Sequence, residues 1–143
     1  MHSIKVKGKT YSFCWGLLTF VNTCDKLDIS LPELHQAIAL DKPKPWYRLA
    51  YQALLTHDET VNDGANTING ELDGFSFLDF MLWFDEQPQE IGDAIIDDYK
   101  KSIYLGRTMQ SRYDEVLEKL NVALEEQSEV AKPTKKKNVR SVK

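Results

Sequence analysis

The acidic residues Glu90, Asp93 and Asp97 form a group whose type and spacing could support chemistry. Steps of three and four residues place them on one face of a helix, where carboxylates can bind a divalent cation or act as an acid and a base. The same spacing is typical of a solvated helix face, and Asp97 and Lys101 are placed for a surface ion pair. We therefore expect an exposed helix face here and no metal.

The other residue types that commonly carry catalysis are scattered. His2, His35 and His57 form neither an HxxxH nor an HExxH pair. The sequence contains no CxxC, GxxxxGK(S/T), GxGxxG or GxSxG motif. We predict no catalytic residue, no cofactor and no metal, and hence a protein that is not an enzyme.

Aromatic side chains give the better indication of a function. Tryptophan and tyrosine are favoured anchors of protein interfaces, although core packing is the more usual role of each one taken singly. We expect at least one of them to lie exposed at a partner surface. The candidate partner-binding residues are Trp15, Trp46, Tyr47, Tyr51, Trp83 and Phe84.

Charge is distributed unevenly along the 143 residues, whose formal net charge is −4. Residues 1–131 carry −10, whereas residues 132–143 carry +6, with Lys135, Lys136, Lys137 and Arg140 among the cations. A basic tail can contact phosphates. This tail has no aromatic residue to stack on bases, and the acidic remainder of the chain repels a polyanion. Nucleic acid is therefore an alternative partner, but not the expected one.

The elements that position these residues begin with a hairpin. Ile4 and Val6 alternate with lysines, Gly8-Lys9 supplies the turn, and the following residues suit a returning strand. A helix is then predicted from the spacing of apolar residues. Its expected inner face is Phe13, Leu17, Phe20, Val21 and Cys24.

A second helix is predicted from its N-terminal pattern: Ser30 as the N-cap, Pro32 in the first turn and Glu33 as the partner in a capping box. We expect it to end at Pro43 and Pro45, with a third helix beginning at Trp46. Residues 58–74 are rich in Asp, Asn and Gly and predict an irregular loop, either extended or folded as an irregular hairpin.

Three further helices are predicted, over 75–86, 90–105 and 108–127. Residues 128–143 contain Pro133, lack apolar periodicity and predict a disordered basic tail. The fold class is therefore mainly α: a compact multi-helix domain, residues 1–127, with a short N-terminal β-hairpin and a disordered basic C-terminal tail. The most apolar window spans about ten residues, from Phe75 to Phe84, which is too short to cross a membrane.

This order of features resembles the siphophage tail assembly chaperone family over residues 4–106. The segments that carry the resemblance are Ile4 to Tyr11, Phe13 to Cys24, Ser30 to Leu34, Trp46 to Leu55, Phe77 to Phe84 and Glu90 to Leu105. The resemblance implies a protein of the host cytoplasm that coats the tape measure protein, helps to recruit tail tube subunits and forms homo-oligomers. The alternatives are a nucleic-acid-associated protein that uses the basic tail, and a structural tail or head-tail connector protein.

Overall fold

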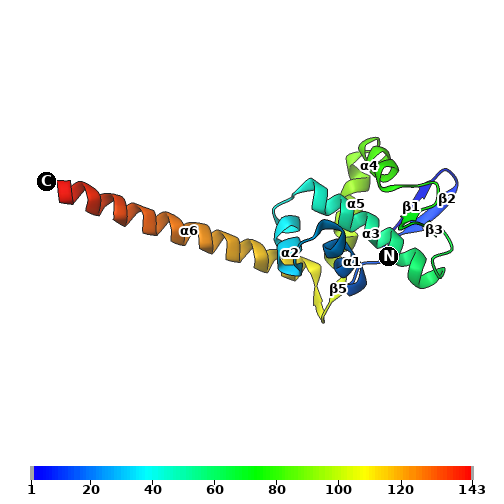
Figure 1. The fold of residues 1–143 in the computed structure, drawn as a ribbon, viewed down its shortest axis with the longest axis horizontal. Coiled ribbons are helices and arrows are strands. Elements are labelled where there is room, and N and C mark those ends of the chain that lie inside the picture. Colours follow the sequence, from blue (N-terminus) through cyan, green and yellow to red (C-terminus); the bar gives the residue numbers. More distant parts are fainter. Residues whose placement is uncertain (1, 143) are drawn as a thin grey trace.

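The computed structural model describes the backbone of residues 2–142 and the side chains of residues 2–126. The fold is mainly α, and helices account for most of the described chain (Figure 1). The helices are α1 (Leu17–Leu27), α2 (Leu31–Ala39), α3 (Pro43–Val61), α4 (Phe77–Asp85), α5 (Gln89–Lys101) and α6 (Met109–Val142). The strands are β1 (Ser3–Val6), β2 (Lys9–Ser12), β3 (Thr67–Ile68), β4 (Glu71–Leu72), β5 (Ile103–Tyr104) and β6 (Arg107–Thr108).

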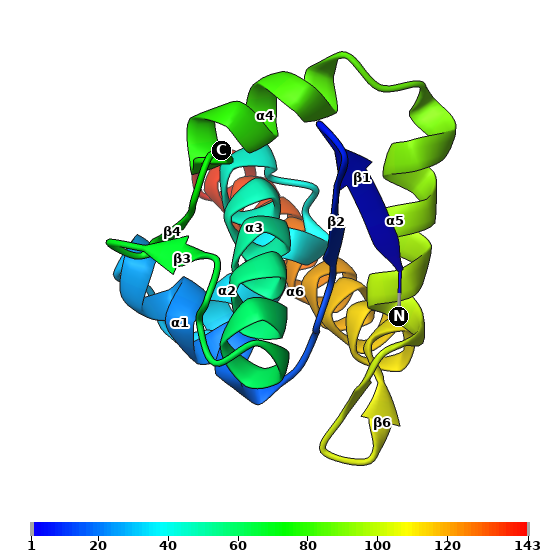
Figure 2. The same ribbon diagram turned by 90° about the vertical axis from the view of Figure 1, so that its right-hand side faces the viewer.

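Helix α3 is the central element, because every residue from Leu49 to Thr56 is buried. A helix that is buried all round must be covered on every side. The other elements surround it, with α1 and α2 on one side and the β1–β2 hairpin, α4 and α5 on others (Figure 2). Two clusters of buried side chains form the core, and α3 contributes to both, with Tyr51 in one and Leu49 in the other.

The N-terminal hairpin is confirmed, with Ile4 opposite Tyr11 and Val6 opposite Lys9. Its turn lies at Lys7-Gly8, one residue earlier than predicted, and both residues have positive φ, of 50° and 80°. Glycine accepts such a φ without the steric penalty of a side chain. The hairpin is joined to the helices where the Cys14 N–H donates to the Ala53 carbonyl at 3.0 Å.

Helix α1 begins at Leu17 rather than at Phe13, and its inner face differs from the prediction. Phe13 continues the hairpin, since its N–H donates to the carbonyl of His2 at 3.0 Å. Leu17 and Val21 point outward, with 54% and 43% of their surface exposed. The predicted apolar stripe is therefore wrong at its start and along one edge.

Two threonines occupy the inner face of α1 instead. Thr19 and Thr23 are fully buried together with Phe20. The Thr19 hydroxyl donates to the Cys14 carbonyl at 2.6 Å and lies 2.7 Å from the Thr56 hydroxyl on α3, while the Thr23 hydroxyl donates to the Thr19 carbonyl at 2.7 Å. These bonds satisfy the hydroxyls, which removes the main penalty for burying them.

The capping box of α2 is confirmed. The Ser30 hydroxyl accepts from the Glu33 N–H, and the Glu33 carboxylate accepts from the Ser30 N–H. The expectation that Pro43 and Pro45 end this helix and precede the next one is wrong, because α3 begins at Pro43. Both prolines lie in its first turn, where no intrahelical N–H bond is lost.

Of the two structures predicted for residues 58–74, an extended loop or an irregular hairpin, the segment contains a hairpin. Helix α3 continues to Val61, and the β3–β4 hairpin occupies part of the remainder. The segment is organised around the buried carboxylate of Asp58, which accepts from Asn62 Nδ2, from the N–H and Nδ2 of Asn66 and from Thr67 Oγ1. One side chain thus fixes the connection between α3 and β3.

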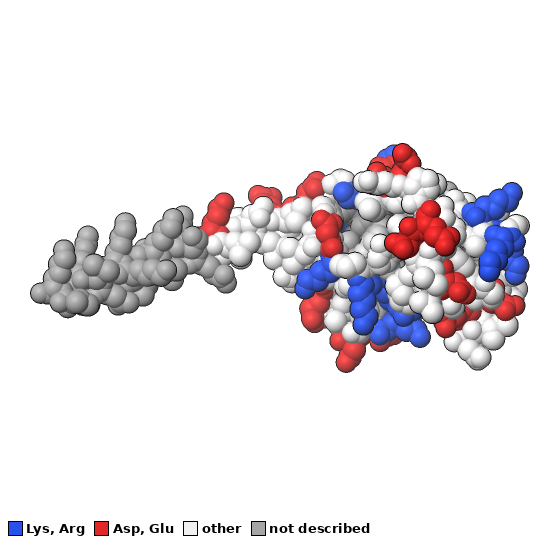
Figure 3. Space-filling view, turned by 90° about the horizontal axis from the view of Figure 1, so that it is seen from above, with Lys and Arg blue, Asp and Glu red and all other residues white. Residues whose placement is uncertain are grey.

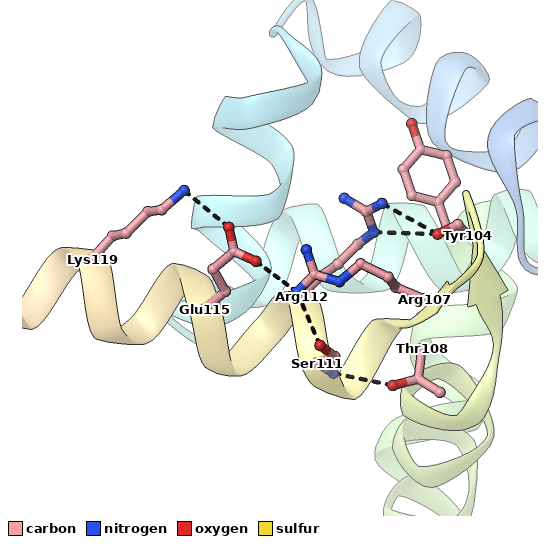
Figure 4. Close-up of polar contacts among 7 residues, drawn as sticks. All are labelled: Tyr104, Arg107, Thr108, Ser111, Arg112, Glu115 and Lys119. Atoms are coloured by element: carbon pink, nitrogen blue, oxygen red, sulfur yellow. Dashed lines mark hydrogen bonds and ion pairs between the residues drawn. The ribbon is translucent and has the colours of Figure 1, made fainter.

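The helix predicted over 90–105 ends at Lys101 as α5, and Ile103 is exposed in the β5–β6 hairpin. The start of α6 is then fixed to this hairpin (Figure 4). Arg112 donates two hydrogen bonds of 3.3 Å to the Tyr104 carbonyl, and Arg107 and Lys119 both pair with Glu115. From there α6 extends away from the other helices (Figure 1). The predicted disordered tail, 128–143, lies outside the residues whose side chains are described.

Candidate functional site

An open groove of about 350 Å³ lies between the first turns of α3, the end of α4, the inner part of α5 and the start of α6. Most of its surface is apolar. The lining side chains include Ile38, Pro43, Trp46, Tyr47, Phe84, Pro88, Ile96, Tyr99 and Tyr113, with Asp41, Asp93 and Lys100 as the charged members. We call this hollow the aromatic groove.

The floor of the groove is fixed by contacts between rings. Trp46 meets Tyr99 edge to face at a centroid distance of 5.4 Å, and Tyr47 meets Phe84 in the same way at 5.2 Å. Edge-to-face pairs are favourable arrangements that hold ring orientations. Each of these pairs joins α3 to a later helix, so the groove is built from segments far apart in the sequence.

Gly92 allows α5 to approach α4 at the groove. A Cβ atom at this position would lie 3.2 Å from Cε1 of Phe84. Such a distance is tighter than ordinary van der Waals contact, so a side chain would force the Phe84 ring to move. The absence of a side chain on Gly92 therefore contributes to the shape of the groove.

The polar groups of the groove are few. Lys100 Nζ lies 4.6 Å from the centroid of the Tyr113 ring, and the Tyr113 hydroxyl lies 3.5 Å from Asp41 Oδ1. Burial raises the pKa of Tyr99, and burial together with the nearby Asp41 raises the pKa of Tyr113. Both phenols are therefore neutral at physiological pH, and the groove presents mainly aromatic and aliphatic surface.

Three of the six predicted aromatic residues meet in this groove: Trp46, Tyr47 and Phe84. Trp15 does not line it, but stacks on Trp46 at a centroid distance of 5.9 Å. Trp83 is half-buried outside the groove and packs against Phe75 and Phe80. Trp46, Tyr47 and Phe84 thus share the surface of the aromatic groove, whereas Trp15 and Trp83 pack against other aromatic rings and do not line it.

Tyr51 is the clear correction to the predicted set. Its side chain is 0% exposed, so it is a core residue and offers no surface to a partner. Its hydroxyl donates to the Phe75 carbonyl at 2.7 Å and accepts from the Leu72 N–H at 2.9 Å. The residue therefore holds the segment before α4 against α3.

Sequence reasoning did not place Ile96, Tyr99 or Tyr113 at a binding site. Tyr99 is buried on the inner face of α5, and its ring also forms part of the groove wall. Ile96 is 36% exposed in the middle of α5. An apolar residue beside the acidic face of this helix was the available signal in the sequence.

The basic residues Lys135, Lys136, Lys137 and Arg140 lie beyond the described side chains. In residues 2–126, acidic and basic groups are interspersed over the surface, as seen on the face drawn in Figure 3. Within the same residues, no three His, Cys, Asp or Glu side chains lie together in a way that could hold a metal ion. No described helix is long and apolar enough to span a membrane.

Several large apolar side chains outside the groove are also exposed. Leu17, Leu18 and Val21 lie on α1, Leu78 and Leu82 lie on α4, and Ile103 and Leu105 lie on the β5–β6 hairpin. Single exposed apolar residues are normal, but groups of them on one element are typical of contact surfaces.

Comparisons of the chain with protein-family models, with curated proteins and with solved structures gave no match.

Proposed function

We propose that this protein is a phage tail assembly chaperone that binds an amphipathic helix of the tape measure protein in the aromatic groove. The observation that carries the proposal is the groove itself: an open apolar surface on a small helical protein, walled by Trp46, Tyr47, Phe84 and Ile96. A groove between helices that presents aromatic and aliphatic side chains is a common receptor for the apolar face of a partner helix.

The side chains of the groove are suited to binding a ligand rather than to catalysing a reaction of it. Its walls are rings and aliphatic chains, and the hydroxyls of Tyr99 and Tyr113, whose pKa values are raised above the ordinary value, are neutral at physiological pH. Covering such a surface with the apolar stripe of a partner helix removes both from water, which is the main driving force of association. A long helical protein that would otherwise aggregate is a suitable partner.

Tail tube subunits would bind to a different surface under this proposal. The exposed leucines of α1 and of the β5–β6 hairpin form candidate contacts of that kind. Because they are separate from the groove, one molecule could contact a tape measure helix and a tube subunit together. The resemblance to the chaperone family supports this assignment of two partners.

Co-expression with the tape measure protein encoded downstream tests the proposal. The wild-type chain is expected to co-purify with that protein and to keep it in solution. Ile96→Asp places a charge on the exposed wall of the groove and should abolish co-purification. Leu124→Asp is the matched control, because Leu124 is an exposed apolar residue of α6 outside the groove, and it should leave co-purification unchanged.

The outcomes separate the parts of the proposal. Co-purification at wild-type yield with Ile96→Asp would overturn the groove as the binding site. A chain that does not co-purify with the downstream protein at all would overturn the chaperone assignment. Salt-sensitive retention of nucleic acid by the full chain, lost on removal of residues 132–143, would instead support the nucleic-acid alternative.

A further inference from the structure

His35 on α2 contains the one side-chain nitrogen or oxygen of the described residues that is buried without a hydrogen-bond partner, its ring atom Nε2. The imidazole lies among other rings. Its centroid is 5.5 Å from that of Phe20 on α1, which meets it edge to face, and 6.0 Å from that of Tyr104 on β5. Native proteins rarely keep a buried polar atom unpaired, so this nitrogen is a candidate for a function beyond packing.

The groups around the imidazole would not stabilise a positive charge on it. Cys24 of α1, Tyr99 of α5 and Tyr104 of β5 are the other titratable members of this buried cluster, and thiols and phenols carry no charge near and below pH 7. Among the described residues, the charged group that acts on His35 is the guanidinium of Arg112 on α6. A proton on Nε2 would therefore meet a cation and no carboxylate.

Arg112 is also the residue that fixes the start of α6. Its guanidinium donates two hydrogen bonds of 3.3 Å to the Tyr104 carbonyl, and its Cζ lies 4.7 Å from the centroid of the Tyr104 ring (Figure 4). Tyr104 thus contacts both the guanidinium and the imidazole. Helix α6 also packs directly on α2, the helix that carries His35. The contact between these two helices therefore brings one permanent cation close to one titratable group.

We propose that protonation of His35 releases the start of α6 from α2. The proton would add a second cation beside Arg112 and a buried N–H donor without an acceptor. Burying a charge without a partner costs far more free energy than burying a neutral ring. Separation of α6 from α2 moves Arg112 away from the imidazolium and lets water reach it, so opening of this contact relieves both costs.

The direction of the pH dependence follows from the same surroundings. Burial and the nearby Arg112 both lower the pKa of His35. A histidine whose folded pKa lies below its unfolded pKa stabilises the closed arrangement in its neutral form. This contribution is complete above the unfolded pKa, near 6.5, and is lost as pH falls toward the folded value. We therefore expect α6 to be held at neutral pH and released in mild acid.

Release of α6 would also change the aromatic groove. Tyr113 follows Arg112 on α6 and lines the groove together with Trp46 and Tyr99 of earlier helices. Movement of the start of α6 would take the Tyr113 wall away from the other two. An effect on partner binding rests on the proposed function of the groove, whereas the release of α6 does not depend on what the groove binds.

A pH titration of the full-length chain from about pH 8 to pH 5, followed by NMR, tests the proposal. The imidazole signals of His35 should titrate with a midpoint below about 6.5, and the amide signals of Tyr104 and Arg112 should shift with the same midpoint. Hydrogen exchange of the amides of residues 113–120, corrected for its intrinsic pH dependence, should accelerate over the same range while the amides of α3 stay protected. Each pH unit by which the midpoint lies below 6.5 should correspond to an acceleration of up to about tenfold.

Three variants identify the group responsible. His35→Phe keeps an aromatic ring that cannot be protonated, so exchange at the start of α6 should lose its pH dependence. His57→Gln is the matched control, because His57 lies on α3 outside this cluster, and it should behave as the wild type does. Arg112→Gln removes the charge but keeps a donor for the Tyr104 carbonyl, and it should move the midpoint of His35 to higher pH.

Four results would overturn the proposal. The first two are a His35 midpoint at or above that of a histidine in an unfolded peptide, and release of α6 that persists in His35→Phe. The third is an unchanged midpoint in Arg112→Gln, which would remove the repulsion from the argument. The fourth is equal acceleration of exchange in α3 and α6, which would mean that acid unfolds the whole chain rather than releasing one helix.

Discussion

The indole Nε1 of Trp15 donates a hydrogen bond of 2.8 Å to Oδ2 of Asp98, although the two residues are 83 positions apart. The same oxygen accepts from the backbone N–H of His2 at 3.1 Å. One carboxylate on α5 thus holds both the N-terminal strand and the segment that precedes α1. The Trp15 ring in turn stacks on Trp46, which lines the aromatic groove.

Replacing Trp15 by Phe should destabilise the fold. The substitution keeps an aromatic ring but removes the only N–H that Trp15 can offer to Asp98, and hydrogen bonds to charged groups contribute about 1.5–3 kcal/mol. Urea unfolding followed by circular dichroism measures the change in unfolding free energy. Asp97→Asn, which removes an exposed carboxylate one residue away, should change it by less than about 1 kcal/mol. An equal loss in both variants would contradict the role given to the Trp15–Asp98 bond.

Tyr51→Phe should cost about 1–3 kcal/mol, because it leaves the Leu72 N–H and the Phe75 carbonyl without a partner in the core. Tyr47→Phe is the matched control, since the Tyr47 ring packs on Phe84 and its hydroxyl forms no bond with a described residue. Thermal unfolding of the two variants compares them directly. Equal stability would show that the Tyr51 hydroxyl has other partners.

Burial raises the pKa of Tyr51 to about 12. A phenol whose folded pKa lies above its unfolded pKa stabilises the fold in its neutral form, and this contribution falls as pH rises above about 10. The wild type should therefore lose unfolding free energy between pH 10 and 12 more steeply than Tyr51→Phe. Ultraviolet titration of the tyrosines, with urea unfolding at each pH, makes the comparison. Parallel pH profiles of the two proteins would contradict this prediction.

Asp58→Asn should weaken the connection between α3 and the β3–β4 hairpin. Burial alone would raise the pKa of this carboxyl, but hydrogen bonds from Thr67, Asn66 and Asn62 outweigh burial and lower it. A depressed pKa means that the ionised form stabilises the fold above the unfolded pKa, near 4, and that this contribution is lost as pH falls through the folded value.

Urea unfolding from pH 6 down to pH 2 measures this dependence. The wild type should lose unfolding free energy below about pH 4, and part of that loss should be missing in Asp58→Asn. Asp63→Asn, in the same segment, is the control and should keep the wild-type dependence. Identical profiles for all three proteins would show that Asp58 does not organise the segment.

Local motifs were predicted well because they are decided within a few residues. The capping box of Ser30 and Glu33 needs only its own turn of helix, and the structure contains it. The inner face of α1 was predicted wrongly, because which side chains of this helix are buried depends on residues far away in the sequence. The Thr19 hydroxyl lies beside that of Thr56, 37 residues later, and no local pattern reveals such a partner.

The same distinction separates the predicted binding residues. Tyr47 and Tyr51 are four residues apart on α3, and both were candidates for a partner surface. Tyr47 faces the aromatic groove, whereas Tyr51 lies within the continuous buried run of that helix. Residue type identified the tyrosines as candidates, but only the arrangement of α4 and α5 around α3 decides which one a partner can reach.

Leu105→Asn tests the tip of the β5–β6 hairpin. Leu105 has a φ of 51° and Gly106 one of 79°, the combination of a type I′ turn, in which Asn and Gly are the favoured residues. A leucine in the left-handed region is strained by roughly 1–2 kcal/mol, yet its side chain is 73% exposed and gains little from packing.

The substitution should therefore raise the unfolding free energy by about 0.5–1 kcal/mol, because part of that strain is relieved. Leu105→Ala also removes the apolar side chain, but alanine lacks the polar group with which asparagine hydrogen-bonds locally in the left-handed region, so it should leave stability nearly unchanged. Urea unfolding of both variants makes the comparison. Binding of tube subunits is measured for the same two variants. If Leu105→Asn stabilises the chain and both variants bind tube subunits less, then Leu105 contacts a partner at the expense of turn stability. If stability does not rise with Asn, the turn is not under strain and the exposed leucine needs no such explanation.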